Sequence, residues 1–383
     1  MSKRKLALPL ICTGLVLAFQ PGCQKGGQQE PATIRIGEYA SLTGATATFG
    51  ISSSRGSRMA TEEWNARGGL LGKKIELITL DNQSKPEEAR LTALRLINES
   101  KVIALLGEVA SSRSLAVAPE AQRYRVPMVS PASTNPAVTE TGDYVFRACF
   151  IDPFQGSAMA KFAYEDLGLR KAAVLFDVRN DYSVGLKTFF MQKFRELGGQ
   201  IVIETSYAEK DIEFRAQLTQ IREAKPEFVF LPGYYNEVGL IARQARELGL
   251  TVPMLGGDGW DSTKTVEIGG EAVEGFYFSN HYASDDPSPA IQEFISRFKV
   301  KYGEVPDAMA VLGYDAAGML YSAIERSGST DPAKIRDALA ATRDYPGISG
   351  VISMDEKRNA RKPLIVLQIR GGKFVYHKSV SPD

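Results

Sequence analysis

Hydroxyl side chains follow two short apolar runs in the middle of the chain. The run VIALLG, residues 102–107, leads into EVASSRS, and the run VPMV, residues 126–129, leads into SPAST. In an open parallel sheet, ligands collect beyond the carboxyl ends of strands, where backbone N–H groups and helix N-termini favour anions. The hydroxyls at these two ends belong to Ser111, Ser112, Ser133 and Thr134. They indicate a site for a small anionic group, and ordinary turn residues and helix caps are the alternative.

Aromatic and acidic residues stand on further loops that follow apolar runs. These are Phe49, Tyr182, Tyr234, Tyr235, Asp258 and Trp260. Each has an alternative explanation, because aromatic residues on loops are often half-buried core edges and an aspartate in GGDGW can cap a turn. Their shared position predicts a cleft with hydroxyls on one wall and an acid with aromatic rings on the other, which suits a small zwitterion.

The residues of common catalytic and metal sites are sparse. The chain has two histidines, His281 and His377, which we expect at the surface or in a hinge, and it has neither HExxH nor CxxC. No P-loop, no GxGxxG after a strand and no GxSxG is present. The sequence therefore predicts a binding protein and not an enzyme, without a metal or a cofactor.

The elements that must position these loops alternate between strand and helix. From Ile34 onward the rhythm predicts a parallel sheet covered by helices on both faces, and it restarts after Arg147. The closing helices and strands suggest that the chain returns to the first lobe and then to the second. The expected lobes are residues 33–148 with 280–347, and residues 149–279 with 348–383. The spacing of Ser84 and Glu87 predicts a capping box at one helix.

Composition and the first residues restrict the class of protein. The 383 residues are enough for two lobes, and 46 basic against 45 acidic residues leave no net field for nucleic acid. A basic start, an apolar run too short to span a bilayer and Cys23 predict a lipoprotein signal over 1–22, lipidation of Cys23 and a polar tether over 23–32. Ordinary export cleavage is the alternative, because Gln20 and Pro21 are atypical before a lipidated cysteine. Cys149 is expected to be a buried small hydrophobe.

Taken in order, several motifs resemble the periplasmic leucine/isoleucine/valine-binding protein family, the type I substrate-binding proteins of ABC transporters. They are IRIGEYASLTGATATFG, NARGG, LGEVASS, VPMVSPAST, FLPGYYNEVG and LGGDGW, and the resemblance runs from about Ile34 to the C-terminus. It implies two doubly wound α/β lobes that are joined by three crossings and close on a ligand. The crossings would fall near 147–150, 278–280 and 347–351.

The resemblance also implies a role for each site residue. Ser111, with the Thr134 N–H, would bind a ligand carboxylate, and so would the backbone at Tyr234. The α-ammonium would meet Asp258, the Thr134 hydroxyl and the Ala132 carbonyl, with Ser133 beside them. Tyr182 and Phe49 would close over the side chain. Asp258 stands where the branched-chain binder has a glutamate, and Ser84 and Ala110 stand where the family has a disulfide.

The function implied is capture of a small amino acid and its delivery to an ABC permease. We expect an exported, envelope-located monomer that meets the membrane only through a lipid anchor. An amide, urea or aromatic carboxylate as ligand is one alternative, and a sensory module that signals to another protein is a second. An enzyme is the third and least favoured.

Overall fold

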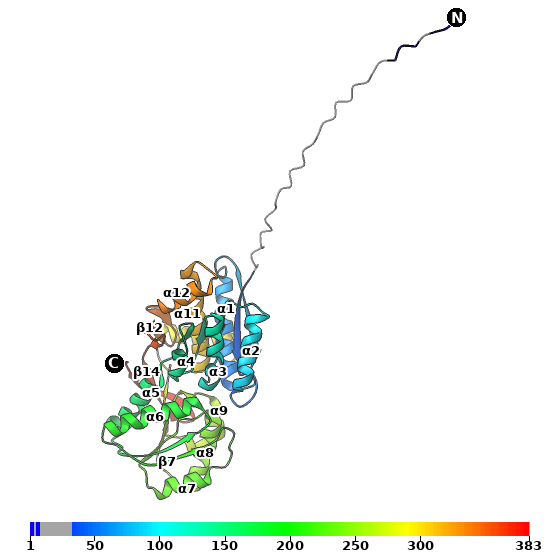
Figure 1. Cartoon of the computed structure of the whole chain (residues 1–383). Coiled ribbons are helices and arrows are strands. Elements are labelled where there is room, and N and C mark those ends of the chain that lie inside the picture. Colours follow the sequence, from blue (N-terminus) through cyan, green and yellow to red (C-terminus); the bar gives the residue numbers. More distant parts are fainter. Residues whose placement is uncertain (4, 8–32, 383) are drawn as a thin grey trace. The chain divides into compact units, whose positions relative to one another are not determined.

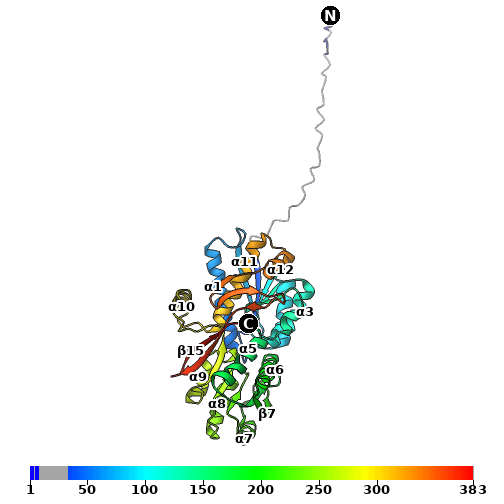
Figure 2. The ribbon, with the colours of Figure 1, turned by 90° about the vertical axis from the view of Figure 1, so that its left-hand side faces the viewer.

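The computed structural model describes residues 1–3, 5–7 and 33–382, and residues 33–383 form one compact unit. The expected signal cleavage, Cys23 and the tether lie outside the described residues. Among the described residues no helix is both long and apolar enough to cross a bilayer. Figure 1 and Figure 2 show the helices of the compact unit in two groups, with α1, α2, α3, α11 and α12 in one and α6, α7, α8 and α9 in the other.

The first lobe is built on a five-stranded sheet in the order β2-β1-β3-β4-β5, and every pairing in it is parallel. Its strands are β1 (Thr33–Ala40), β2 (Lys74–Asp81), β3 (Ala104–Leu106), β4 (Met128–Ser130) and β5 (Val145–Arg147). The strands that follow β1 extend the sheet first on one side and then on the other. This reversal creates a switch point between β1 and β3, the usual place for a ligand in such a sheet.

Helices cover both faces of this sheet. They are α1 (Ala47–Ala66), α2 (Pro86–Asn98), α3 (Ser111–Tyr124), α4 (Ala137–Glu140), α11 (Ala308–Ser327) and α12 (Pro332–Ala340). A further helix, α10 (Pro289–Tyr302), packs on α1 and α11. On one face, Ile36 and Val129 pack against Leu320 of α11. On the other, Leu105 packs with Leu96 of α2 and Val117 of α3. These apolar residues recur at helical spacing, so burial of one face of each helix fixes the layers.

The second lobe contains a seven-stranded sheet in the order β15-β14-β10-β9-β8-β6-β7. Its parallel part repeats the first lobe's winding with β6 (Lys171–Asp177), β7 (Gln200–Tyr207), β8 (Phe228–Phe230), β9 (Met254–Gly256) and β10 (Tyr277–Asn280). The two remaining strands, β14 (Leu364–Arg370) and β15 (Lys373–Val380), are antiparallel. The expected doubly wound lobes are confirmed, and this antiparallel edge is an addition to them.

Helices again lie on both faces of the second sheet. They are α5 (Asp152–Lys161) continued by η1 (Phe162–Asp166), α6 (Asp181–Glu196), α7 (Arg215–Glu223), α8 (Tyr235–Glu247), η2 (Asp258–Trp260), α9 (Thr263–Gly269) and η3 (Gly270–Val273). Phe190 of α6 stacks on Phe230 of β8, with ring centroids 3.7 Å apart. Trp260 is fully buried on the opposite face, where its indole donates to the Leu231 carbonyl at 3.0 Å. Trp260 is therefore a core residue.

The chain passes between the lobes three times. The first crossing lies between β5 and α5, and the second follows Asn280 at the end of β10. The third lies at residues 362–363, later than the 347–351 expected from the sequence. The reason is a small sheet of β11 (Tyr345–Gly347), β12 (Gly350–Met354) and β13 (Ala360–Arg361). Its Ile352 and Met354 are buried in the first lobe's core, so this segment belongs to the first lobe.

Candidate functional site

The loops at the carboxyl ends of the strands of both sheets meet around a small cavity. Its volume is about 10 Å³, room for about one water molecule. It is lined by Phe49, Val109, Ser111, Ala132, Tyr182, Tyr234, Asp258, Gly259 and Met309. Six of the eight residues predicted from the sequence are among these. Thr134 and Ser133 are not, and Val109, Gly259 and Met309 are additions.

Ser111 forms the first-lobe wall because it begins α3 directly after the loop that follows β3. Its hydroxyl accepts the Asn135 N–H at 3.2 Å. The preceding loop is held by Glu108, a buried carboxylate that accepts the Ala110 N–H at 2.7 Å and the Asn82 amide at 3.1 Å. A helix N-terminus carries partial positive charge and free N–H groups. This wall therefore favours a negatively charged group.

The loop after β4 places Thr134 and Ser133 differently. The Thr134 hydroxyl is buried and has no hydrogen-bond partner among the described residues. The Ser133 hydroxyl, in contrast, is bonded to the Glu108 carbonyl at 2.8 Å and to the Ser114 hydroxyl at 2.7 Å. The Ser133 side chain therefore points away from the cavity, and its hydroxyl links the loop after β4 to the loop after β3. The Thr134 hydroxyl lies next to the site and faces the buried carboxyl of Asp152.

Asp258 supplies the opposite wall from η2, which follows β9. Its side chain is buried, and it accepts hydrogen bonds from the Gln155 amide at 2.9 Å and from His281 Nε2 at 3.0 Å. Burial lowers the pKa of His281 to about 4, so the imidazole is neutral at pH 7 and the proton between the pair lies on Nε2. Asp258 is therefore a carboxylate held by two neutral donors. Such a buried charge favours a cation beside it.

Gln155 and His281 are functional residues that the sequence did not reveal. Gln155 lies in the first turns of α5, after the first crossing, and His281 follows β10 at the second crossing. His281 is thus a hinge residue, one of the two places expected for it, but it is fully buried and its ring stacks on Phe150 at 3.8 Å. Position at a crossing was the available signal, because both segments must pass near the interlobe site.

Aromatic rings from both lobes close the cavity. Tyr182 and Tyr234 stack with centroids 5.4 Å apart, and Phe49 of the first lobe meets Tyr234 edge-on at 5.5 Å. The Tyr182 hydroxyl accepts the Gly259 N–H at 3.2 Å. A Cβ on Gly259 would lie 2.6 Å from the Gly233 carbonyl oxygen and 2.8 Å from the Tyr234 ring. Gly259, the last glycine of GGDGW, is therefore needed for Tyr182 and Tyr234 to approach each other.

A second buried carboxyl lies near the site and faces the Thr134 hydroxyl. Asp152 begins α5, is fully buried, and donates its backbone N–H to the Thr134 carbonyl at 2.9 Å. The Thr134 hydroxyl faces this carboxyl outside ordinary hydrogen-bond geometry, and no other hydrogen-bond partner is found among the described residues. Burial raises the pKa of Asp152 to about 8, so the group is largely protonated at pH 7. It adds little negative charge to that of Asp258.

Comparison with known proteins agrees with this architecture. The profile of the periplasmic binding protein family matches residues 33–373. A crystal structure of a leucine-binding protein from Thermotoga maritima is 44% identical, superposes with a TM-score of 0.88, and covers 91% of this chain and 99% of its own. A branched-chain amino acid transporter substrate-binding protein from Streptococcus pneumoniae, crystallised with isoleucine, is 32% identical with a TM-score of 0.87 and covers 91% and 100%.

A relative matched by sequence alone indicates the same family. Leu/Ile/Val-binding protein homolog 3 from Brucella melitensis is 31% identical over 87% of this chain and 90% of its own length. The chain belongs to the Leu/Ile/Val-binding proteins of ABC transporters, within the type I periplasmic binding protein family. This is a family of extracytoplasmic substrate-binding proteins and not of enzymes.

Proposed function

We propose that this protein captures a free aliphatic α-amino acid of the branched-chain type between its two lobes and delivers it to an ABC permease. The observation that carries the proposal is the opposite character of the two walls. Ser111 and the N-terminus of α3 favour an anion, and Asp258, held by neutral donors, favours a cation. A zwitterion satisfies both walls at once.

The proposed pose follows from the groups that remain free. The ligand carboxylate would take the Ser111 and Thr134 N–H groups, with the Tyr234 N–H reaching it from the second lobe. The ammonium would lie between Asp258 and the Thr134 hydroxyl, which has no hydrogen-bond partner among the described residues. The aliphatic side chain would pack on Phe49 and Tyr182. Charge-assisted hydrogen bonds are the strong ones, so most of the affinity would come from the two charged ends.

Capture would proceed as a population shift between open and closed arrangements of the lobes. The structure has the closed arrangement, since Phe49 touches Tyr234 across the cleft. A cavity of about 10 Å³ is too small for leucine in this arrangement, so the ligand would have to enter an open form and the loops would have to adjust around it. Only a ligand that contacts both walls gains from closure.

Delivery and location are part of the same proposal. The mature protein would act as a monomer outside the cytoplasm, tethered through a lipid on Cys23, and would hand its ligand to permease subunits. The motif at residues 1–23 and membership of an ABC-transporter family support this arrangement. Mass spectrometry of the protein purified from membranes would show a diacylglyceryl mass on Cys23, whereas an unmodified N-terminus would contradict the anchor.

A thermal-shift panel tests the ligand class. L-leucine, L-isoleucine and L-valine are expected to raise the melting temperature, since a ligand at 100 times its Kd adds about 2.7 kcal/mol of stability. Acetamide, urea and benzoate serve as the competing classes. A shift produced by benzoate and not by the amino acids would overturn the proposal, because Asp258 would then face an anion.

A further inference from the structure

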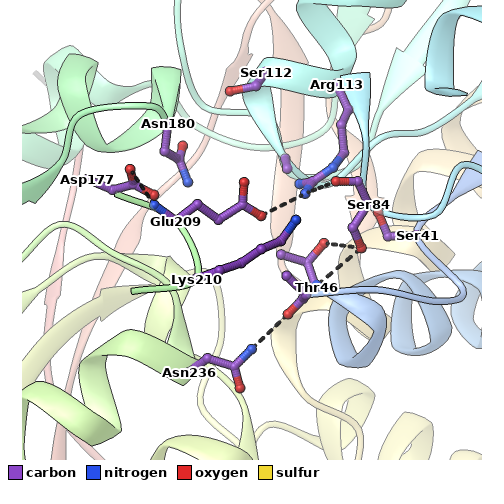
Figure 3. A network of polar contacts seen from close by, with 12 residues as sticks. Ser41, Thr46, Ser84, Ser112, Arg113, Asp177, Asn180, Glu209, Lys210 and Asn236 are labelled. Atoms are coloured by element: carbon purple, nitrogen blue, oxygen red, sulfur yellow. Dashed lines mark hydrogen bonds and ion pairs between the residues drawn. The ribbon is translucent and has the colours of Figure 1, made fainter. Parts of the chain in front are cut away.

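A buried arginine of the first lobe meets an acidic cluster of the second at the edge of the cleft. Arg113 lies in α3 two residues after Ser111, and its side chain is 4% exposed. Its guanidinium donates to the Ser84 carbonyl at 2.7 Å within its own lobe and lies 3.6 Å from the Glu209 carboxylate of the other lobe. Figure 3 shows Glu209 and Lys210 reaching from the second lobe toward Arg113 and Ser84.

The acidic cluster comprises Asp177, Glu209, Asp211 and Glu237, carried by the end of β6, the loop after β7 and α8. Its members are tied together through backbone groups, since the Glu209 N–H donates to Asp177 at 3.1 Å and the Lys210 N–H donates to Glu237 at 3.1 Å. Burial, and then the neighbouring charges of Glu209 and Asp211, raise the pKa of Asp177 to about 6. The cluster therefore holds like charges that repel one another.

One cation that pairs with this cluster comes from across the cleft. Among the described residues, the pair with Arg113 is the one ion pair that any of these four carboxylates makes. The Arg113 Nε and one Glu209 oxygen are buried and have no hydrogen-bond partner there. The bond from Arg113 to Ser84 lies within the first lobe and the pair with Glu209 spans the cleft, so separation of the lobes would break only the pair with Glu209.

We propose that Arg113 is the residue that latches the lobes: its guanidinium pairs with Glu209 at the edge of the acidic cluster and shifts the protein toward the closed arrangement. The latch is an ion pair, whereas the other polar contacts between the lobes, within the described residues, are hydrogen bonds with at least one neutral partner. They include Tyr235 and Asn236 with the Ala45 carbonyl, at 3.0 and 2.8 Å, Asn135 with the Asp181 carbonyl, at 2.8 Å, the Asp181 N–H with the Ser112 hydroxyl, at 3.0 Å, and the Ala308 N–H with the Asp261 carboxyl, at 2.6 Å. Arg113 also lies close to the cavity, two residues after Ser111, and its positive charge lowers the pKa of Tyr234 against the larger rise that burial causes. Arg113 is thus a positioning residue that acts on the ligand through closure.

A double-mutant cycle on the ligand-free protein tests the latch without any assumption about the ligand. Cysteines introduced at Leu91 of α2 and Gln220 of α7, both exposed, carry nitroxide spin labels. Double electron–electron resonance between the labels reports the distance between the lobes. Cys12 and Cys23 are replaced by serine, and Cys149 is fully buried. Arg113→Gln and Glu209→Gln are each expected to lower the closed-to-open ratio about 3- to 10-fold, and the double variant no further than either single one.

Two further variants show that charge and not packing is responsible. Arg113→Lys should retain most of the closed population, and Glu213→Gln, an exposed residue of the same loop that pairs with Arg215, should change nothing. Unchanged distances in both single variants, or effects that add fully in the double variant, would overturn the latch. Because Glu209 is part-exposed, Glu209→Gln carries the test even if Arg113→Gln fails to fold. Failure of the wild type to bind any amino acid would contradict the proposed function and would not affect this measurement.

Discussion

Replacement of Asp258 by asparagine is the sharpest perturbation of the proposed site. Asparagine has nearly the same shape, and it keeps an oxygen to accept one of the two hydrogen bonds from Gln155 and His281. It removes the one charge that faces the proposed ammonium. A hydrogen bond to a charged group contributes about 1.5 to 3 kcal/mol, and each 1.4 kcal/mol is tenfold in Kd. We therefore expect the Kd for leucine to rise about 10- to 150-fold.

The assay is isothermal titration calorimetry of the wild type and Asp258→Asn with L-leucine and L-isoleucine. Glu267→Gln is the matched control, because it also replaces a carboxylate by an amide in the second lobe but on the exposed surface of α9. Thermal unfolding of each variant separates lost binding from lost folding. A Kd for Asp258→Asn within twofold of the wild type would refute the reasoning that this carboxylate holds the ligand.

Three further predictions concern the residues around this carboxylate. The pKa of Asp152 is raised from 3.8 to about 8, so its stability contribution is full below about pH 4 and is lost as pH rises through about 8. Asp152→Asn should therefore stabilise the protein by several kcal/mol more at pH 8 than at pH 4, measured by urea unfolding. The pKa of His281 is lowered from 6.5 to about 4, so its stability contribution is full above pH 6.5 and is lost as pH falls through about 4. His281→Gln should therefore make the unfolding free energy depend less on pH between 6.5 and about 4. The same pH dependence as in the wild type would contradict a neutral imidazole. Gly259→Ala adds a Cβ that forces Tyr182 and Tyr234 apart. The variant should bind leucine at least about tenfold more weakly in calorimetry and lose about 1 to 3 kcal/mol of stability. Wild-type affinity would show that the two tyrosines accommodate the added Cβ.

The sequence predicted the lobes well because their signal is local. Alternation of apolar strands with amphipathic helices repeats along the chain, and the closing helices expected from the sequence are found as α10, α11 and α12. Cys149 is buried in the second lobe's core, as expected for a small hydrophobe. The third crossing was misplaced, because the apolar residues of GVISM suit either lobe and only packing against α11 and α12 decides between them.

Side-chain hydrogen bonding was harder to predict, because it depends on partners far away in sequence. The expected capping box at Ser84 is wrong: the helix begins after Lys85 without a side-chain cap, and the Ser84 hydroxyl donates to the Thr43 carbonyl at 2.7 Å. Ser133 carries the same hydroxyl as Ser111, yet its bond to Ser114 turns it away from the cavity. Residue type and loop position could place these groups near the site but could not show their direction.

The central claim is that the site recognises both charges of an amino acid. Its most direct test is calorimetric titration of the wild type with L-leucine and with 4-methylpentanoate, which has the same carboxylate and side chain but no ammonium group. With 4-methylpentanoate bound, the buried Asp258 carboxylate would have no cation beside it and would repel the ligand's carboxylate. We therefore predict tight binding of leucine and at least about 100-fold weaker binding of 4-methylpentanoate. Equal affinity for the two compounds would contradict the assignment of Asp258 to the ammonium and, with it, the proposed function.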